Sequence, residues 1–71
     1  MATEVRAEMV ANVGTIVVAP GDVVADGDTL VILESMKMEI PVLAEAAGTV
    51  AEVRVSQGDV VQEGDVIAVI G

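Results

Sequence analysis

The sequence predicts an all-β fold, a sandwich or barrel built from two similar halves. Valine dominates a 71-residue chain that contains no Phe, Tyr or Trp, and β-branched side chains suit a pleated strand better than a helix. Gly-Asp pairs recur at short intervals, a pattern typical of short strands joined by tight turns. Residues 5–33 also match residues 42–70 at a constant offset of 37, with 11 of 29 aligned positions identical. We therefore expect pseudo-twofold symmetry.

The first half of each copy predicts strands whose alternation is broken once. Residues 4–10 alternate loosely and predict a first strand, followed by a strand over residues 13–18 that residues 50–55 mirror. In both mirrored segments the apolar positions run i, i+3, i+5, so the alternation breaks once, as it does at a β-bulge. The pattern directs four side chains to the core (Ile16, Val18, Val53 and Val55) and two outward (Val17 and Arg54).

Glycine-aspartate pairs mark the turns of the second half of each copy. Pro20-Gly21-Asp22 is typical of a type II turn, in which glycine supplies the positive φ, and residues 57–59 repeat it. Six residues later Gly27-Asp28 and Gly64-Asp65 mark a second turn. Residues 23–24 and 60–61 are long enough only for stub strands, whereas residues 29–33 and 66–70 are aliphatic runs of strand length. We expect the four aspartates to bond their own turn backbones.

Residues 34–41 lie between the copies and belong to neither. Residues 33–47 are rich in helix-forming residues and, taken alone, predict a helix interrupted by Pro41. The repeat overrides this, because residues 42–45 align with the strand-like residues 5–8. The most compact link between the halves is a hairpin that turns near Met36-Lys37. No Gly or Asn favours that turn, so a strained backbone there would be retained for function.

Composition excludes several classes of function. The chain has no Cys and no His, which removes disulfides, thiol chemistry, the usual zinc ligands and histidine-based acid–base catalysis. Its net charge is −9, and its three cations, Arg6, Lys37 and Arg54, are too few and too scattered for a nucleic-acid surface. No apolar run approaches a membrane span and no signal peptide is evident. We expect a cytoplasmic protein without a metal, a membrane or a nucleic acid as partner.

Lys37 is the only lysine of the chain and lies in the unpaired central segment. One interpretation is a covalent attachment point, at which the ε-amine attacks an activated carboxylate supplied by an external ligase and forms an amide. Glu34 and Glu39 would keep that amine protonated until the ligase removes the proton. The other interpretation is an ordinary solvated lysine with Met36 and Met38 as core filler. No catalytic constellation of the chain's own is found, so we do not expect an enzyme.

The segment Glu34-Ser35-Met36-Lys37-Met38-Glu39 resembles the attachment motif of biotinyl domains, in which alanine commonly occupies the position of Ser35. The family's Gly-x-Val-x-x-Val-x-Val-x-x-Gly-Asp pattern is matched from Gly48 to Asp59, and the first copy repeats it with Ala11 in place of the leading glycine. The resemblance covers essentially the whole chain. The chain is similar to a short, free-standing biotin carboxyl carrier protein.

The resemblance implies a flattened barrel of two four-stranded sheets with the lysine on an exposed hairpin, here one carrier domain over residues 1–71. It implies that biotin protein ligase attaches biotin to Lys37, with Met36 and Met38 as recognition flanks and Glu34, Ser35 and Glu39 as weaker motif neighbours. Biotin carboxylase and carboxyltransferase subunits would then load and unload carboxylate, serving an acyl-CoA or related carboxylase. Two alternatives stay open: a lipoyl carrier, which the methionines disfavour, and an unmodified interaction module.

Overall fold

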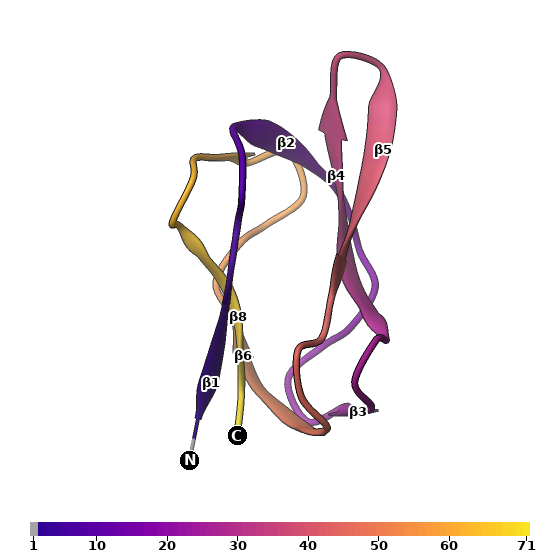
Figure 1. Cartoon of the computed structure of the whole chain (residues 1–71), viewed down its shortest axis with the longest axis vertical. Helices are drawn as coiled ribbons and strands as arrows, with labels where there is room; N and C mark the ends of the chain where they lie inside the picture. The colour runs from indigo at the N-terminus through magenta and orange to yellow at the C-terminus, as the bar shows by residue number, and fades with distance from the viewer. Residues whose placement is uncertain (1) are drawn as a thin grey trace.

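The computed structural model describes residues 2–71, which form eight β-strands and two four-stranded sheets (Figure 1). The strands are β1 (Thr3–Arg6), β2 (Ala11–Ile16), β3 (Val23–Val24), β4 (Thr29–Ser35), β5 (Met38–Leu43), β6 (Gly48–Val53), β7 (Val60–Val61) and β8 (Val66–Ile70). One sheet has the order β1-β8-β6-β3 and the other the order β5-β4-β2-β7. The predicted all-β class and the two four-stranded sheets are confirmed. No helix long and apolar enough to cross a membrane is found in residues 2–71.

The sequence repeat is a structural repeat. An offset of 37 residues maps β1 to β4 onto β5 to β8, so each strand of one sheet has its mate at the equivalent place in the other. The backbone bonds follow the same rule. Gly21 N donates to Val50 O at 2.8 Å, and its mate Gly58 N donates to Val13 O at 2.8 Å. Each half thus contributes strands to both sheets, and the two halves interlock instead of packing side by side.

The four predicted turns are present with the expected chemistry. Gly21, Gly27, Gly58 and Gly64 all have φ between 92° and 97°, which L-residues with a Cβ rarely adopt. In each turn an aspartate Oδ2 accepts a bond from the backbone N–H three residues earlier, as Asp22 does from Ala19 at 2.9 Å and Asp59 from Ser56 at 2.8 Å. Asp28 and Asp65 accept the equivalent bonds from the backbone N–H groups of Ala25 and Gln62. The four Gly-Asp aspartates therefore serve the turns, as predicted.

Aliphatic side chains alone fill the space between the sheets. The largest fully buried side chains are Leu30, Leu33, Ile67, Val5, Val13, Val31 and Val50, and no polar side chain of residues 2–71 is buried. Ile16, Val18, Val53 and Val55 pack against this core half-buried, while Val17 and Arg54 are exposed, as the broken alternation predicts. Register shifts between Val13 and Thr15 and between Val50 and Glu52 confirm a bulge in both copies.

Three strands have boundaries that differ from the predicted ones. The first strand ends at Arg6 and not at residue 10, because the backbone of Ala7 bonds to the turn at Gly64 and Asp65 and leaves the sheet. The strands expected over residues 13–18 and 50–55 occupy Ala11–Ile16 and Gly48–Val53 instead. In each case pairing with a neighbouring strand, which a single segment does not reveal, decides where the strand begins and ends.

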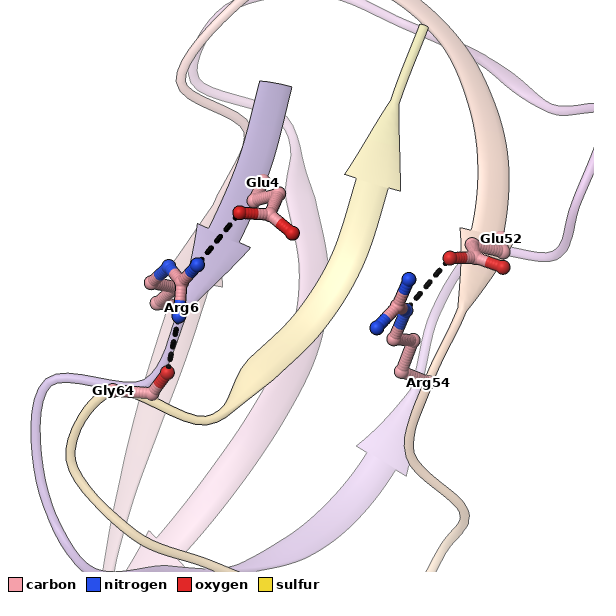
Figure 2. Close-up of polar contacts among 5 residues, drawn as sticks. All are labelled: Glu4, Arg6, Glu52, Arg54 and Gly64. Carbon is pink, nitrogen blue, oxygen red and sulfur yellow. Dashed lines mark hydrogen bonds and ion pairs between the residues drawn. The ribbon is translucent and has the colours of Figure 1, made fainter. Parts of the chain in front are cut away.

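Two ion pairs flank strand β8 on the outer face of its sheet (Figure 2). Arg6 Nη2 lies 2.6 Å from Glu4 Oε1, and Arg54 Nε lies 2.6 Å from Glu52 Oε1. Glu4 and Glu52 are both in register with Val69, which is only 8% exposed. Exposed ion pairs of this kind contribute little stability, but their aliphatic stems cover apolar surface. Both arginines are thus engaged away from the central hairpin.

Candidate functional site

The segment between the two halves is a β-hairpin at one end of the molecule. Strands β4 and β5 pair in register from Leu33 and Ile40 up to Ser35 and Met38, which leaves a loop of only two residues, Met36 and Lys37. In Figure 1 this hairpin extends beyond the other strands at one end of the long axis, and both chain termini lie toward the opposite end. The predicted hairpin is confirmed, and the predicted turn position is correct.

The helix-forming composition of this segment does not decide its structure. Residues 34–35 extend β4 and residues 38–41 begin β5, so the eight residues between the copies form two strand ends and a turn. Pro41 is accommodated because β5 is an edge strand of its sheet, where a missing N–H need not interrupt a ladder. Pairing along the whole length of β4 outweighs the local helix propensity.

The two turn residues adopt a backbone conformation that suits neither of them. Met36 has φ 51° and Lys37 has φ 66°, and they are the only non-glycine residues with positive φ in the described chain, residues 2–71. Positive φ at both central residues defines a type I′ turn, which usually contains Asn-Gly. Each non-glycine residue in this region costs about 1–3 kcal/mol. A chain that places glycine at four other turns keeps methionine and lysine at this one.

Both methionines of the hairpin are exposed, which excludes a role as core filler. Met36 is 91% exposed and Met38 is 64% exposed. Neither methionine belongs to the core or packs against it, and the first residue of β5 that does so is Ile40. Exposed methionines are flexible, polarizable contact residues at binding surfaces. Their position on either side of Lys37 therefore favours contact with a partner over a contribution to folding.

The Lys37 amine is free for reaction. Its side chain is exposed and takes part in none of the ion pairs or side-chain hydrogen bonds found among residues 2–71. Glu34 and Glu39 face each other across β4 and β5, one register step below the pair Ser35 and Met38. Neither carboxylate forms an ion pair with the lysine, because the turn carries Lys37 beyond the last strand pair.

Glu34 lies closely against strand β2. A Cβ placed on Gly14 would be 3.0 Å from both Cγ and Cδ of Glu34, closer than nearly all ordinary contacts. Gly14 does not have a positive φ, so glycine is present there for space and not for its backbone freedom. At the equivalent place in the second copy, Ala51 Cβ is 3.8 Å from the position of a Cβ on Gly71. In the second copy glycine stands in place of the glutamate, and alanine is accommodated in place of Gly14.

Residues distant in sequence complete the surroundings of the hairpin. An open groove of about 510 Å³ is lined by residues 34–39 together with Val10, Ala11, Asn12 and Val60. Val10 is 63% exposed and Val60 is 64% exposed. The sequence did not predict Val10 and Val60 as part of the site, because they precede β2 and begin β7, well outside the central motif. Ser35 lines the groove half-buried.

The arrangement presents a nucleophile without a charged partner at its amine among residues 2–71. A primary amine stands at the tip of a hairpin, flanked by two exposed methionines and two exposed glutamates. The glutamates form no ion pair with the amine, and the chain has no histidine or cysteine. Such a site can be acylated by an enzyme that brings its own activated acyl group and its own base. It has the properties of an attachment point.

Comparison with known proteins identifies relatives in sequence. The family model described as "Biotin-requiring enzyme" matches residues 3–70. The biotinylated protein TB7.3 homologue of Mycolicibacterium smegmatis is 68% identical over 44 residues, and that of Mycobacterium leprae is 66% identical over 44 residues. In both cases the aligned segment spans 62% of this chain and 62% of the relative.

Solved structures match over more of the chain. Kluyveromyces lactis urea carboxylase matches with a TM-score of 0.94 and 37% identity, over 100% of this chain and 6% of the carboxylase. A single-chain, multi-domain long-chain acyl-CoA carboxylase matches with a TM-score of 0.87 and 32% identity, over 96% of this chain and 7% of that one. The lipoyl domain of the Azotobacter vinelandii 2-oxoglutarate dehydrogenase complex matches with a TM-score of 0.73 and 32% identity, over 87% of this chain and 78% of that domain. The chain belongs to the biotin-requiring family, and biotin is the cofactor that this membership implies.

Proposed function

We propose that this chain is a biotin carboxyl carrier whose biotin is joined covalently to Lys37. The observation that carries the proposal is the exposed amine of the chain's only lysine at the tip of a two-residue turn, between two exposed methionines. Membership of the biotin-requiring family supports biotin as the group attached. Met36 and Met38 are the recognition flanks in this proposal, and Glu34, Ser35 and Glu39 are secondary contacts.

The residues of the site fit an acyl group held through an amide. The Nζ atom of Lys37 forms a bond to the carboxyl carbon of biotin, the activating group on that carbon leaves with its electron pair, and the ammonium group loses two protons. Nothing in the turn restrains Nζ, and no hydrogen bond or ion pair within residues 2–71 has to break first. The ligase supplies activation and the base, since the glutamates lie away from the amine.

The domain's own contribution is presentation. The attachment hairpin and the termini lie toward opposite ends of a body 33 Å long (Figure 1), so a neighbouring chain or subunit at the termini leaves the lysine clear. When bound, biotin supplies a nitrogen that accepts carboxylate in one active site and releases it in another. We infer that biotin carboxylase and carboxyltransferase provide those active sites, in an acyl-CoA carboxylase or a related enzyme. Solved relatives are carboxylases of urea and of long-chain acyl-CoA.

A lipoyl carrier is the second candidate, because a lipoyl domain shares the fold with a TM-score of 0.73. The residues flanking the lysine separate the two possibilities. The exposed methionines of this hairpin resemble the biotinyl motif and not the lipoyl one. Modification mass distinguishes them directly, since the two acyl groups differ in mass.

The test is intact-mass spectrometry after co-expression with an active biotin protein ligase. Wild type is expected to gain one biotinyl group, and Lys37→Arg none. Arginine is the matched control because it keeps the charge and a long side chain at the turn, so loss of the increment reports the amine itself. The proposal would be overturned if the wild type stayed unmodified while a known acceptor protein, treated in the same way, was biotinylated. A mass increment of one lipoyl group would identify the attached group as lipoate and not biotin.

A further inference from the structure

The end of the molecule that carries Lys37 also carries an exposed apolar and acidic surface, here called the hairpin-end patch. It consists of Val10, Glu34, Met36, Met38, Glu39 and Val60, which line a common groove. Four of the eight large hydrophobic side chains that are exposed among residues 2–71 belong to it, with exposed fractions from 63% to 91%. A domain of this size gains nothing in stability from apolar side chains left in water. A clustered group of them indicates a contact surface.

The strand register places Val60 beside the hairpin. Glu39, Glu34, Asn12 and Val60 form one row across β5, β4, β2 and β7. All four side chains are exposed, so they lie on the outer face of the sheet. With about 4.8 Å between strands and about 3.3 Å per residue, Val60 lies roughly 12 Å to the side of the hairpin axis and roughly 8 Å below Lys37. Its distance from the tip is therefore about 14 Å.

Any enzyme that encloses the lysine must come close to this row. A specific protein–protein contact buries about 800 Å² on each partner, which corresponds to a disc of about 16 Å radius. A disc centred on the tip of the hairpin and lying over this face of the sheet would include Val60 and Val10. The short turn makes this close approach more necessary, because a two-residue loop places Lys37 only a short distance beyond the ends of β4 and β5.

The charge of the patch indicates the chemistry of the partner surface. Glu34 and Glu39 take part in no ion pair among residues 2–71, whereas Glu4 and Glu52 are paired with arginines. The whole chain has a net charge of −9. A partner with basic groups opposite the two glutamates and an apolar surface opposite the valines and methionines is complementary to it.

We propose that Val10 and Val60, beyond the central motif, form part of the surface on which the ligase that modifies Lys37 docks. This rests on the proposed function. The ligase is the occupant to which the geometry points first, because its reaction needs the bare amine at the tip and so the closest approach to the hairpin. The valines supply apolar contact and the glutamates fix orientation through basic groups of the ligase.

The internal symmetry supplies a matched control. Val23 is the repeat mate of Val60: both begin a two-residue strand after a Gly-Asp turn, and they are 81% and 64% exposed. Val23 pairs with Thr49 and belongs to the other sheet, where no hairpin protrudes. The variants Val60→Arg and Val23→Arg therefore have identical composition and net charge, and they differ only in which end of the molecule carries the change.

The experiment measures the steady-state kinetics of biotinylation of the purified, unmodified domain by a biotin protein ligase. Val60→Arg is expected to lower kcat/KM by about tenfold or more, mainly through KM, while Val23→Arg stays within about twofold of wild type. Val60→Ser and Val23→Ser repeat the comparison without added charge, and thermal melts identify any variant that has lost its fold. Val10→Ser is expected to act in the same direction as Val60→Ser.

The outcomes are distinct from those of the functional proposal. Failure of the wild type to accept biotin would overturn the carrier function itself. With wild type modified normally, equal kinetics for Val60→Arg and Val23→Arg would overturn the docking surface. A Val60→Arg protein that is biotinylated at the wild-type rate but is a poorer substrate of biotin carboxylase would also overturn it, and would assign the patch to the carboxylase.

Discussion

Replacing the two turn residues by the pair that the turn geometry prefers should stabilise the fold while removing the proposed attachment site. The perturbation is Met36→Asn together with Lys37→Gly. Asparagine and glycine are the preferred residues of a type I′ turn, and the native pair has φ 51° and 66°. Because Met36 is 91% exposed and Lys37 is exposed, the change removes almost no buried surface.

The expected gain follows from the backbone alone. The left-handed region costs an ordinary L-residue about 1–2 kcal/mol, asparagine less, and glycine almost nothing. Against this, glycine lowers stability by about 0.5–1 kcal/mol because it has more freedom to lose on folding. The net expectation is a free energy of unfolding higher by about 1–2 kcal/mol. For a domain of 60–100 residues, each kcal/mol raises Tm by about 4–8 °C.

The assay is thermal and urea unfolding of the unmodified proteins, followed by circular dichroism. Met38→Asn is the matched control: the same substitution, two residues away, at an exposed position of strand β5. There asparagine should be neutral or slightly destabilising, since it is disfavoured in strands. A double variant that melts at or below the wild-type temperature would refute the reasoning that this turn stores strain, as would an equal gain from Met38→Asn.

Two further predictions concern glycines whose roles differ. Gly21→Val and Gly58→Val should each lower the free energy of unfolding by about 1–3 kcal/mol and by similar amounts, because both glycines have positive φ and open space around the added Cβ. A urea melt in which one of them is neutral would contradict the equivalence of the halves. Gly14→Ala should instead destabilise through contact with Glu34 and should cost less in a Glu34→Ala background. A double-mutant cycle on unfolding free energies should give a coupling of at least about 0.5 kcal/mol, and additive effects would show that the close contact is relieved at no cost.

The central hairpin shows that local sequence propensity alone does not predict its structure. Residues 33–47 have the composition of a helix, and only alignment with the first copy predicts a strand there. The turn position at Met36 and Lys37 follows from the same alignment, and the structure confirms it. That Lys37 forms no ion pair with Glu34 or Glu39 was not predictable from proximity in sequence, because side-chain placement depends on the positive φ of both turn residues.

The surface around the hairpin depends on contacts between distant segments. Val60 reaches the site because β7 pairs with β2, and β2 pairs with β4. The repeat predicts that Val60 resembles Val23, but it does not say which of the two lies beside the lysine. The sequence repeat makes the two halves equivalent, and the hairpin between them breaks this equivalence. The strand order of the sheets decides that the hairpin lies in the same sheet as β7 and not in that of β3.

The sequence by itself determined the all-β class, the two equivalent halves, the four glycine turns and the hairpin that carries Lys37. The class and the turns depend on short-range physics, namely β-branched composition and positive φ at glycine. The equivalent halves and the hairpin depend on a repeat that can be read along the chain. Only the tertiary structure decided that each half gives strands to both sheets, that Gly14 makes room for Glu34, and that Val10 and Val60 line the same groove as Lys37. Strand order and register are set by pairing and packing between residues far apart in the chain, and one sequence records those partners only indirectly.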